Sequence, residues 1–323
     1  MVRVAFAGTF AASMEARMRG RLSVPCEVIV ADERAIVPKL ADVDVLVTLA
    51  FTAEMGATAR RLRLVQVPGA GLDRIDRAAL PPGTWLANAY GHEVGIAEYV
   101  MAVMLAWTRE LGRLDGALHQ GVWLSQWAVG TAPPPTWPEL AGRTLGILGY
   151  GRIGQQLARR ARAFDMRVLA TRRTPGPPDA GVELRGPDAL DEVLARADYL
   201  AITLSLNPET RGLLGARELG LMKPTALLIN VARGEIVDED ALYEALARRA
   251  LAGAALDVWY RYPTAPGTTF PSRRPFHELP NVLMTPHVSG WTDGMLEARA
   301  TVIAENIARA SRGEPPLNLV APS

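Results

Sequence analysis

Short apolar segments alternate with polar, helix-like stretches along most of this chain, and that alternation restricts the fold more than any other feature. In the first ninety residues the apolar segments are Val2–Phe6, Glu27–Val30, Val43–Leu49, Leu64–Val67 and Trp85–Asn88. Their apolarity is continuous, which is typical of strands that are covered on both faces in a parallel sheet. The first part of the chain is therefore predicted to form an α/β unit.

A second series of the same kind begins at Thr144. Its apolar segments are Thr144–Leu148, Arg167–Thr171, Tyr199–Leu204, Ala226–Asn230, Gly253–Val258 and Asn281–Thr285. Helical patterns separate most of them, including Arg152–Phe164 and Glu239–Arg249. Strand and helix in alternation predict right-handed crossovers and an open, doubly wound sheet.

The two series are separated by a helix and a proline-rich stretch. Apolar residues recur at helical spacing within 91–111, and a stiff connection follows at 131–138. Another helical pattern runs from Trp291 towards the end of the chain. At roughly 150 residues per domain, 323 residues correspond to about two domains.

Composition excludes several classes of function. Lys plus Arg number 35 and Asp plus Glu 34, which argues against a nucleic-acid surface. No apolar run reaches the roughly 20 residues that a membrane span needs, and the first residues lack the pattern of a signal peptide. One cysteine and four scattered histidines argue against a disulfide framework and a structural zinc site. We therefore expect a globular, cytoplasmic protein without metal, membrane or nucleic-acid partners.

A glycine-rich turn marks the start of the second series. Gly149-Tyr150-Gly151-Arg152-Ile153-Gly154 follows a predicted strand and opens a predicted helix. Gly149 permits the tight turn, Gly151 lets backbone approach a pyrophosphate, and Gly154 lets helix and strand pack closely. The helix N-terminus provides N–H donors and a positive dipole end for the phosphates. The motif in this context predicts dinucleotide binding.

The next strand ends in Thr171-Arg172-Arg173 rather than in the acidic residue that holds the ribose 2′-hydroxyl of NAD. Two guanidinium groups at this position would bind a 2′-phosphate through charge-assisted hydrogen bonds. The sequence therefore predicts that NADP(H) is preferred, with NAD(H) as the alternative; a solvated arginine pair would leave the preference open.

The motifs together resemble the D-isomer-specific 2-hydroxyacid dehydrogenases over essentially the whole chain. They are, in order, Gly69–Asp76, Ile96-Ala97-Glu98-Tyr99, Gly149–Gly154, Ile229–Gly234, Ala255–Trp259 and Thr285-Pro286-His287. The resemblance implies two Rossmann-like domains, a flavodoxin-like substrate domain (1–95 and 292–323) and a dinucleotide-binding domain (96–291). It also implies an active site in the cleft between them and a homodimer formed through the nucleotide domains.

Two residues match the family's principal catalytic positions. Arg233 follows a predicted strand end, and its guanidinium can fork onto a 2-keto acid, holding the carboxylate and polarising the carbonyl. His287 matches the acid/base that gives a proton to the carbonyl oxygen as hydride arrives. A structural arginine at the sheet edge and a structural histidine are the respective alternatives.

Further contacts follow from the resemblance alone. The loop at Ala70 and Gly71 is expected to cradle the substrate carboxylate, and Trp291 either lines the pocket or only packs. Coenzyme contacts are expected from Arg152, Ile153, Asn207, Thr210, Val231, Asp257 and Gly290, with Asp257 on the nicotinamide side. His92, His119 and His277 match no catalytic position, and Glu98 is interpreted as part of the helix structure.

The chain departs from the family at one catalytic position. The glutamate that pairs with the family's histidine is replaced by Tyr262, just before Pro263. A carboxylate would raise the pKa of the histidine, whereas a neutral phenol can only form a hydrogen bond. The segment 263–275 is also longer than usual and is either a lid or a surface loop.

Three functions remain open from the sequence. The first is hydride transfer between NAD(P)H and a small 2-keto or 2-hydroxy acid, as in hydroxypyruvate and glyoxylate reductases. The second keeps the fold but oxidises a small oxyanion such as formate or phosphite without a proton relay. The third is a sensor or corepressor that binds the nucleotide without turnover. Retention of Arg233, Asp257 and His287 together favours an enzyme acting on a small anion.

Overall fold

The computed structural model describes residues 1–130, 132, 136–174, 176 and 179–320. The predicted proline-rich connection lies partly outside the described residues, since it includes 131 and 133–135. The chain divides into two compact units. The first is Met1–His92 together with the chain from Trp291 onward, and the second is Glu93–Gly290.

The first unit contains a five-stranded parallel sheet. Its strands are β1 (Val2–Ala7), β2 (Cys26–Ala31), β3 (Val45–Thr48), β4 (Leu64–Gln66) and β5 (Trp85–Ala87). They lie in the order β2-β1-β3-β4-β5, which is the flavodoxin-like order. The helices of this unit are α1 (Thr9–Arg19), α2 (Ala53–Thr58) and α9 (Asp293–Arg312), with short 3₁₀ turns at Val37–Asp42 and Arg77–Ala79.

The second unit is built on a seven-stranded parallel sheet. Its strands are β6 (Thr144–Leu148), β7 (Arg167–Thr171), β8 (Val182–Arg185), β9 (Tyr199–Ile202), β10 (Leu227–Asn230), β11 (Gly253–Leu256) and β12 (Val282–Met284). Their order is β12-β11-β10-β9-β6-β7-β8, a doubly wound arrangement in which the direction of winding reverses beside β6. The predicted fold class, two Rossmann-like α/β units, is confirmed.

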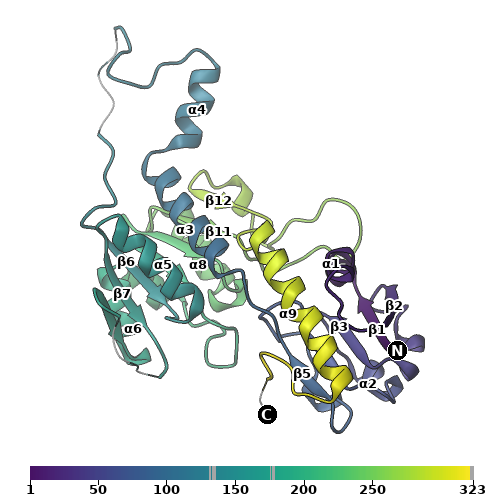
Figure 1. Ribbon diagram of the computed structural model, residues 1–323. Coiled ribbons are helices and arrows are strands. Elements are labelled where there is room, and N and C mark those ends of the chain that lie inside the picture. Colours follow the sequence, from purple (N-terminus) through teal and green to yellow (C-terminus); the bar gives the residue numbers. More distant parts are fainter. Residues whose placement is uncertain (131, 133–135, 175, 177–178, 321–323) are drawn as a thin grey trace. The chain divides into compact units, whose positions relative to one another are not determined.

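Helices cover this second sheet (Figure 1). They are α3 (Glu93–Thr108), α5 (Arg152–Ala163), α6 (Leu190–Arg196), α7 (Ala216–Leu221) and α8 (Glu239–Ala247). The unit also contains helix α4 (Leu111–His119), which does not cover the sheet. Short 3₁₀ turns occur at Pro187–Ala189, Gly234–Ile236 and Phe276–Glu278. All residues of β6, β9, β10 and β11 are buried, which explains why these strands are continuously apolar in the sequence.

Two elements of the structure are not predicted by the apolar pattern of the sequence. Strand β8 lies at the edge of the sheet, and only its first residue is buried, so it lacks an apolar run. Helix α4 has no buried residue and therefore no core-facing stripe. The predicted helix over 91–111 is in fact divided: α3 ends at Thr108, and Glu110 takes a left-handed conformation (φ 49°) before α4 begins.

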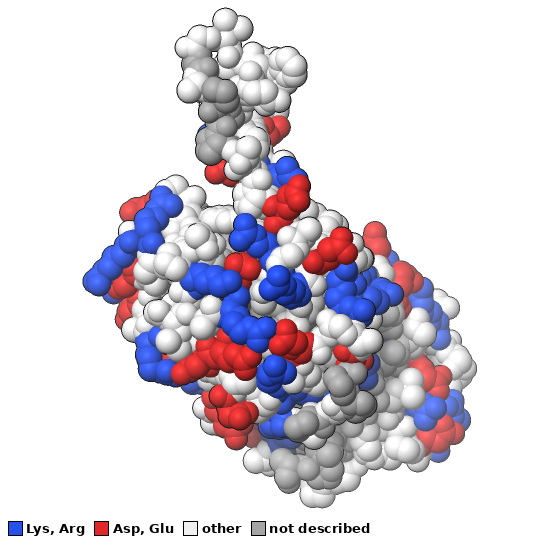
Figure 2. Space-filling model, turned by 90° about the vertical axis from the view of Figure 1, so that its left-hand side faces the viewer, with Lys and Arg blue, Asp and Glu red and all other residues white. Residues whose placement is uncertain are grey.

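Helix α4 and the following residues 120–130 stand away from the sheet of the second unit as an arm (Figure 1). The arm exposes a set of large apolar side chains, namely Leu118, Val122, Trp123, Trp127 and Val129. In Figure 2 this projection is mostly uncharged, whereas acidic and basic side chains are interspersed over the body.

In the part of the chain that the structure describes, no helix has both the length and the apolarity that a membrane crossing requires.

Candidate active site

The predicted catalytic and coenzyme-binding residues of the second unit gather at one edge of its sheet. All the strand pairs are parallel, so the loops that follow β6, β7, β10, β11 and β12 leave from the same edge. These loops carry, respectively, the glycine motif, Arg172, Arg233, Asp257 and His287. In open α/β sheets this is the edge at which ligands bind.

The glycine motif has the geometry that its sequence predicts. Gly149 has φ +101°, and a Cβ there would lie 3.0 Å from the backbone of Thr203 and Leu204. A Cβ on Gly154 would lie 2.7 Å from the carbonyl oxygen of Gly149. Both positions therefore require glycine for close packing, since backbone cannot easily move aside.

Gly151 differs from its two neighbours because a Cβ there would meet no atom within 4 Å. It forms the N-cap of α5 without any side-chain cap hydrogen bond. The N-terminus of this twelve-residue helix therefore faces open space with its first-turn N–H groups uncapped by a side chain. That cradle fits a pyrophosphate group, which accepts hydrogen bonds from such N–H groups.

The end of β7 presents the two predicted arginines. Arg172 and Arg173 are exposed, and the Nη1 atom of Arg172 lies 3.0 Å from the position that a Cβ on Gly176 would occupy. Tyr150 of the glycine motif is buried, and its hydroxyl group donates a hydrogen bond to the Asp179 carboxylate (2.5 Å). The loop after β7 is thereby tied to the glycine turn.

Arg233 occupies the loop after β10. Asn230 supports this loop twice, because its amide donates to the Arg233 carbonyl oxygen (2.9 Å) and accepts from the Ala232 N–H (3.1 Å). Gly234 follows, and a Cβ there would lie 2.6 Å from the Trp259 carbonyl carbon. Close contact between the loops after β10 and β11 therefore sets the path of the chain at Arg233.

Tyr262 lies in hydrogen-bond contact with His287. The Tyr262 hydroxyl and the His287 Nδ1 are 2.8 Å apart, and the Trp259 N–H also donates to that hydroxyl (3.4 Å). Burial raises the pKa of the Tyr262 phenol, while the Trp259 N–H and the Arg233 charge oppose the shift. The phenol that replaces the family's glutamate thus contacts the histidine directly and stays neutral near pH 7.

Asp257 follows β11 directly and is completely buried. Its Oδ1 accepts hydrogen bonds from the Thr285 hydroxyl (2.6 Å) and the Val288 N–H (2.9 Å), and its Oδ2 accepts from the Ser289 N–H (2.8 Å). This carboxylate therefore binds the segment that carries His287.

The other coenzyme residues expected from the resemblance lie on the same loops. Asn207 and Thr210 are hydrogen-bonded to each other in the turn after β9, where the Asn207 side-chain oxygen accepts from the Thr210 N–H (2.9 Å). Val231 is buried directly after β10, and Gly290 ends the second unit.

The remaining predicted substrate residues belong to the first unit. Ala70 and Gly71 lie in the loop after β4, where Asn88 donates to the Ala70 carbonyl oxygen (3.1 Å). Trp291 is 49% exposed, and its ring meets that of Phe10 edge to face at 5.5 Å. Within its own unit Trp291 is therefore a packing residue with one exposed face.

The long segment 263–275 is anchored at its C-terminal end. The Glu239 carboxylate at the start of α8 accepts hydrogen bonds from the Ser272 hydroxyl (2.6 Å) and from the Arg273 side chain (2.7 Å). Residues 263–270 are exposed. His277 stacks on Phe270, with ring centroids 4.4 Å apart, and His119 lies on α4, which has no buried residue.

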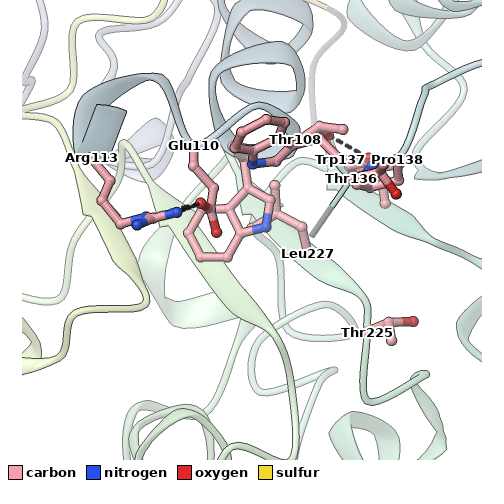
Figure 3. Close-up of a pocket in the computed structure, with 10 residues that line it drawn as sticks. Thr108, Glu110, Arg113, Thr136, Trp137, Pro138, Thr225 and Leu227 are labelled. Atoms are coloured by element: carbon pink, nitrogen blue, oxygen red, sulfur yellow. Dashed lines mark hydrogen bonds and ion pairs between the residues drawn. The ribbon is translucent and has the colours of Figure 1, made fainter. Parts of the chain in front are cut away.

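The pocket in Figure 3 lies at the opposite edge of the same sheet. It is about 290 Å³ in volume and is lined by residues at the base of the arm and at the amino ends of β9 and β10, among them Trp107, Glu110, Trp137, Tyr199 and Leu227. It contains none of the predicted site residues.

Among the described residues, no group of three or more His, Cys, Asp or Glu side chains could hold a metal ion.

Sequence reasoning missed two hydroxyl groups at the active edge. Tyr99 on α3 and Thr285 after β12 lie within motifs of the family, yet neither received a role. Their hydroxyls are 2.7 Å apart. The available signal was a tyrosine in helix segment 96–104, where Glu98 is the only other residue that is not apolar.

The chain matches known proteins over most of its length. Residues 101–289 match the family model for the NAD binding domain of D-isomer specific 2-hydroxyacid dehydrogenases. A glyoxylate reductase from Pyrococcus furiosus is 37% identical over 296 residues, covering 88% of this chain and 84% of that protein. A D-3-phosphoglycerate dehydrogenase from Methanocaldococcus jannaschii is 35% identical, and the match covers 88% of this chain but only 53% of that longer protein.

The fold has matching solved structures as well. An NADPH-dependent glyoxylate/hydroxypyruvate reductase from Sinorhizobium meliloti, solved with NADP and sulfate, superposes with a TM-score of 0.81. It is 27% identical, and the match covers 99% of this chain and 98% of that one. The fold and the glycine motif define an NAD(P)-dependent oxidoreductase. The chain belongs to the D-isomer specific 2-hydroxyacid dehydrogenase family, as its motifs predict.

Proposed function

We propose that this protein transfers a hydride between NADP(H) and a small 2-keto or 2-hydroxy acid with D specificity, and that glyoxylate or hydroxypyruvate belongs to its substrate class. The observation that carries the proposal is the hydrogen bond between Tyr262 and His287 at the sheet edge that also carries Arg233 and the glycine motif. The proposal is tested by measuring the decrease in NADPH absorbance when the protein is mixed with each member of a panel of 2-keto acids.

Each residue at this edge has a defined task in the proposed reaction. The glycine turn and the N-terminus of α5 hold the pyrophosphate. When bound, the reduced nicotinamide supplies the hydride for the carbonyl carbon. Arg233 holds the substrate carboxylate and polarises the carbonyl. Because Tyr262 engages Nδ1 of His287, we assign Nε2 as the nitrogen that gives the proton to the carbonyl oxygen.

Oxidation of formate or phosphite needs no proton relay, and a nucleotide sensor needs neither Arg233 nor His287. The direct contact between Tyr262 and Nδ1 of His287 supports the keto-acid reaction over both alternatives, because it orients an imidazole for proton transfer. Formate and phosphite belong in the substrate panel as the competing class. Turnover of either one in a variant without the Arg233 guanidinium would favour the oxyanion reaction.

Replacing Tyr262 by glutamate should move the pH dependence of reduction upward. A carboxylate would take the place of a hydroxyl that is 2.8 Å from Nδ1, and its charge would stabilise the imidazolium. Arg233, Asp257 and Glu235 also act electrostatically on the side chain at position 262. The substitution leaves these three charges in place and changes only the charge at position 262. We expect the alkaline limb of kcat for keto-acid reduction to shift to higher pH by about one unit. Tyr262→Phe is the control, and an unchanged limb in Tyr262→Glu would contradict the assignment.

NADP(H) should bind more tightly than NAD(H). Arg172 and Arg173 follow β7 and are exposed, so both guanidinium groups can reach a 2′-phosphate. The Sinorhizobium meliloti reductase was solved with NADP, which supports the same preference. We expect Arg172→Ala to raise KM for NADPH about tenfold or more while leaving KM for NADH nearly unchanged. Equal KM values for the two coenzymes in the unaltered protein would contradict this preference.

We also propose a cytoplasmic homodimer, in which the arm packs on the nucleotide-binding unit of a second copy. Exposed Trp127 (76%) and Val129 (98%) support an apolar contact, because such side chains are costly to leave in water. Sedimentation equilibrium should give twice the mass of the chain, and a monomer at micromolar concentration would contradict it.

A further inference from the structure

Three hydrogen-bond donors from the segment that carries His287 converge on one buried carboxylate. Asp257 has no exposed surface, and it accepts from the Thr285 hydroxyl, the Val288 N–H and the Ser289 N–H at 2.6–2.9 Å. One donor precedes His287 in the sequence and two follow it. The carboxylate therefore holds the chain on both sides of the histidine.

The backbone of His287 requires such support. Its φ of +59° lies in the left-handed region, which L-residues with large side chains rarely adopt. A residue keeps this conformation only when its surroundings determine it. The neighbouring N–H groups of Val288 and Ser289 donate to Asp257, so this carboxylate stabilises the turn.

The hydrogen bonds extend from Asp257 to helix α3 in a fixed direction. An ionised carboxylate can only accept, so the Thr285 hydroxyl donates to Asp257. The Thr285 oxygen then accepts from the Tyr99 hydroxyl at 2.7 Å. Burial raises the pKa of the Tyr99 phenol, which keeps this donor protonated. The Trp259 indole N–H also donates to the Thr285 carbonyl oxygen (2.8 Å), so Thr285 is held at two points.

We infer that Tyr99, Thr285 and Asp257 form a positioning chain that sets the orientation of His287 for proton transfer. This inference rests on the proposed function of His287. It gives Asp257 a different task from the nicotinamide contact that the family resemblance implies, because three of its roughly four acceptor sites serve the His287 turn. Tyr99, Thr285 and Asp257 are positioning residues and need not touch the substrate.

The test compares two substitutions of Thr285 that differ in one hydroxyl group. Thr285→Val keeps the shape but removes the hydrogen bonds to Asp257 and Tyr99, and Thr285→Ser keeps the hydroxyl. We expect kcat for keto-acid reduction to fall about tenfold to a hundredfold in Thr285→Val, since a small displacement of a catalytic group has effects of this size. The dissociation constant of NADPH should stay unchanged, and Thr285→Ser should restore most of kcat.

A second readout does not depend on activity. The chain has four histidines, so the ¹⁵N signals of labelled imidazoles can be assigned with single substitutions. We expect the His287 signals to move in Thr285→Val and in Tyr99→Phe and to return in Thr285→Ser. Tyr99→Phe removes only the Tyr99 hydroxyl, which lies at the end of the chain farthest from Asp257. This variant therefore tests the inference even if Thr285→Val folds poorly.

The outcomes separate the two proposals. Loss of NADPH affinity in Thr285→Val with unmoved His287 signals would mean that Asp257 serves the coenzyme, and the inference would be overturned. Equal kcat values in the valine, serine and unaltered proteins would also overturn it while leaving the proposed function intact. If the unaltered protein reduces no 2-keto acid but the His287 signals respond as expected, the proposed function fails and the positioning chain stands.

Discussion

Replacing Arg233 by glutamine should lower kcat/KM for a 2-keto acid by about 10²–10⁴-fold, because two hydrogen bonds to a charged group are lost at about 1.5–3 kcal/mol each. Asn230 binds the loop backbone at positions 232 and 233, and these hydrogen bonds remain in the variant, whereas the hydrogen bond from the Arg233 guanidinium to the Ala232 carbonyl oxygen (2.7 Å) is lost. Steady-state kinetics with glyoxylate and hydroxypyruvate measure the effect.

Arg233→Lys is the matched control for this result. Lysine keeps the charge but cannot form the planar fork, so it should recover only part of the lost activity. The dissociation constant of NADPH should be the same in all three proteins. Full activity in Arg233→Gln, or an equal loss of coenzyme affinity, would show that Arg233 does not bind the substrate.

Replacing His287 by asparagine should lower kcat by about 10²–10⁴-fold, the usual contribution of a positioned acid/base. Asparagine is the informative choice because it tolerates the left-handed backbone (φ +59°) that other residues would strain. The experiment therefore removes the imidazole with little change in the turn. Single-turnover oxidation of bound NADPH measures the step directly.

His119→Asn provides the control, since this histidine lies on the exposed helix α4. It should leave kcat unchanged. An unchanged kcat in His287→Asn as well would mean that the reaction needs no proton from His287, as in the oxidation of formate or phosphite.

Much of the fold follows from local patterns. Buried strands such as β6 and β10 are continuously apolar, and the bounds of β6 and β7 agree with the prediction because glycine or arginine follows directly. The edge strand β8 and the arm helix α4 bury too little to leave such a pattern. They were not predictable from periodicity for that reason.

The candidate site was predictable only in part. Motif order identified Arg233, Tyr262 and His287, and the replacement of the usual glutamate by Tyr262 is visible in the sequence. It could not indicate whether the phenol would reach the imidazole. The 2.8 Å contact with Nδ1 depends on the paths of two loops, one after β11 and the other after β12.

Short segments with their own periodicity and turn chemistry specify the fold class, the glycine turn and the residue types at the carboxyl edge of the sheet, so these features can be predicted from the sequence. The hydrogen-bonded arrangement of Tyr99, Thr285 and Asp257 is visible only in the folded structure. Their hydrogen bonds join residues 28 and 186 positions apart. Contacts over such separations form when strands and helices pack, so no local pattern encodes them, and the left-handed backbone of His287 is sustained by that packing.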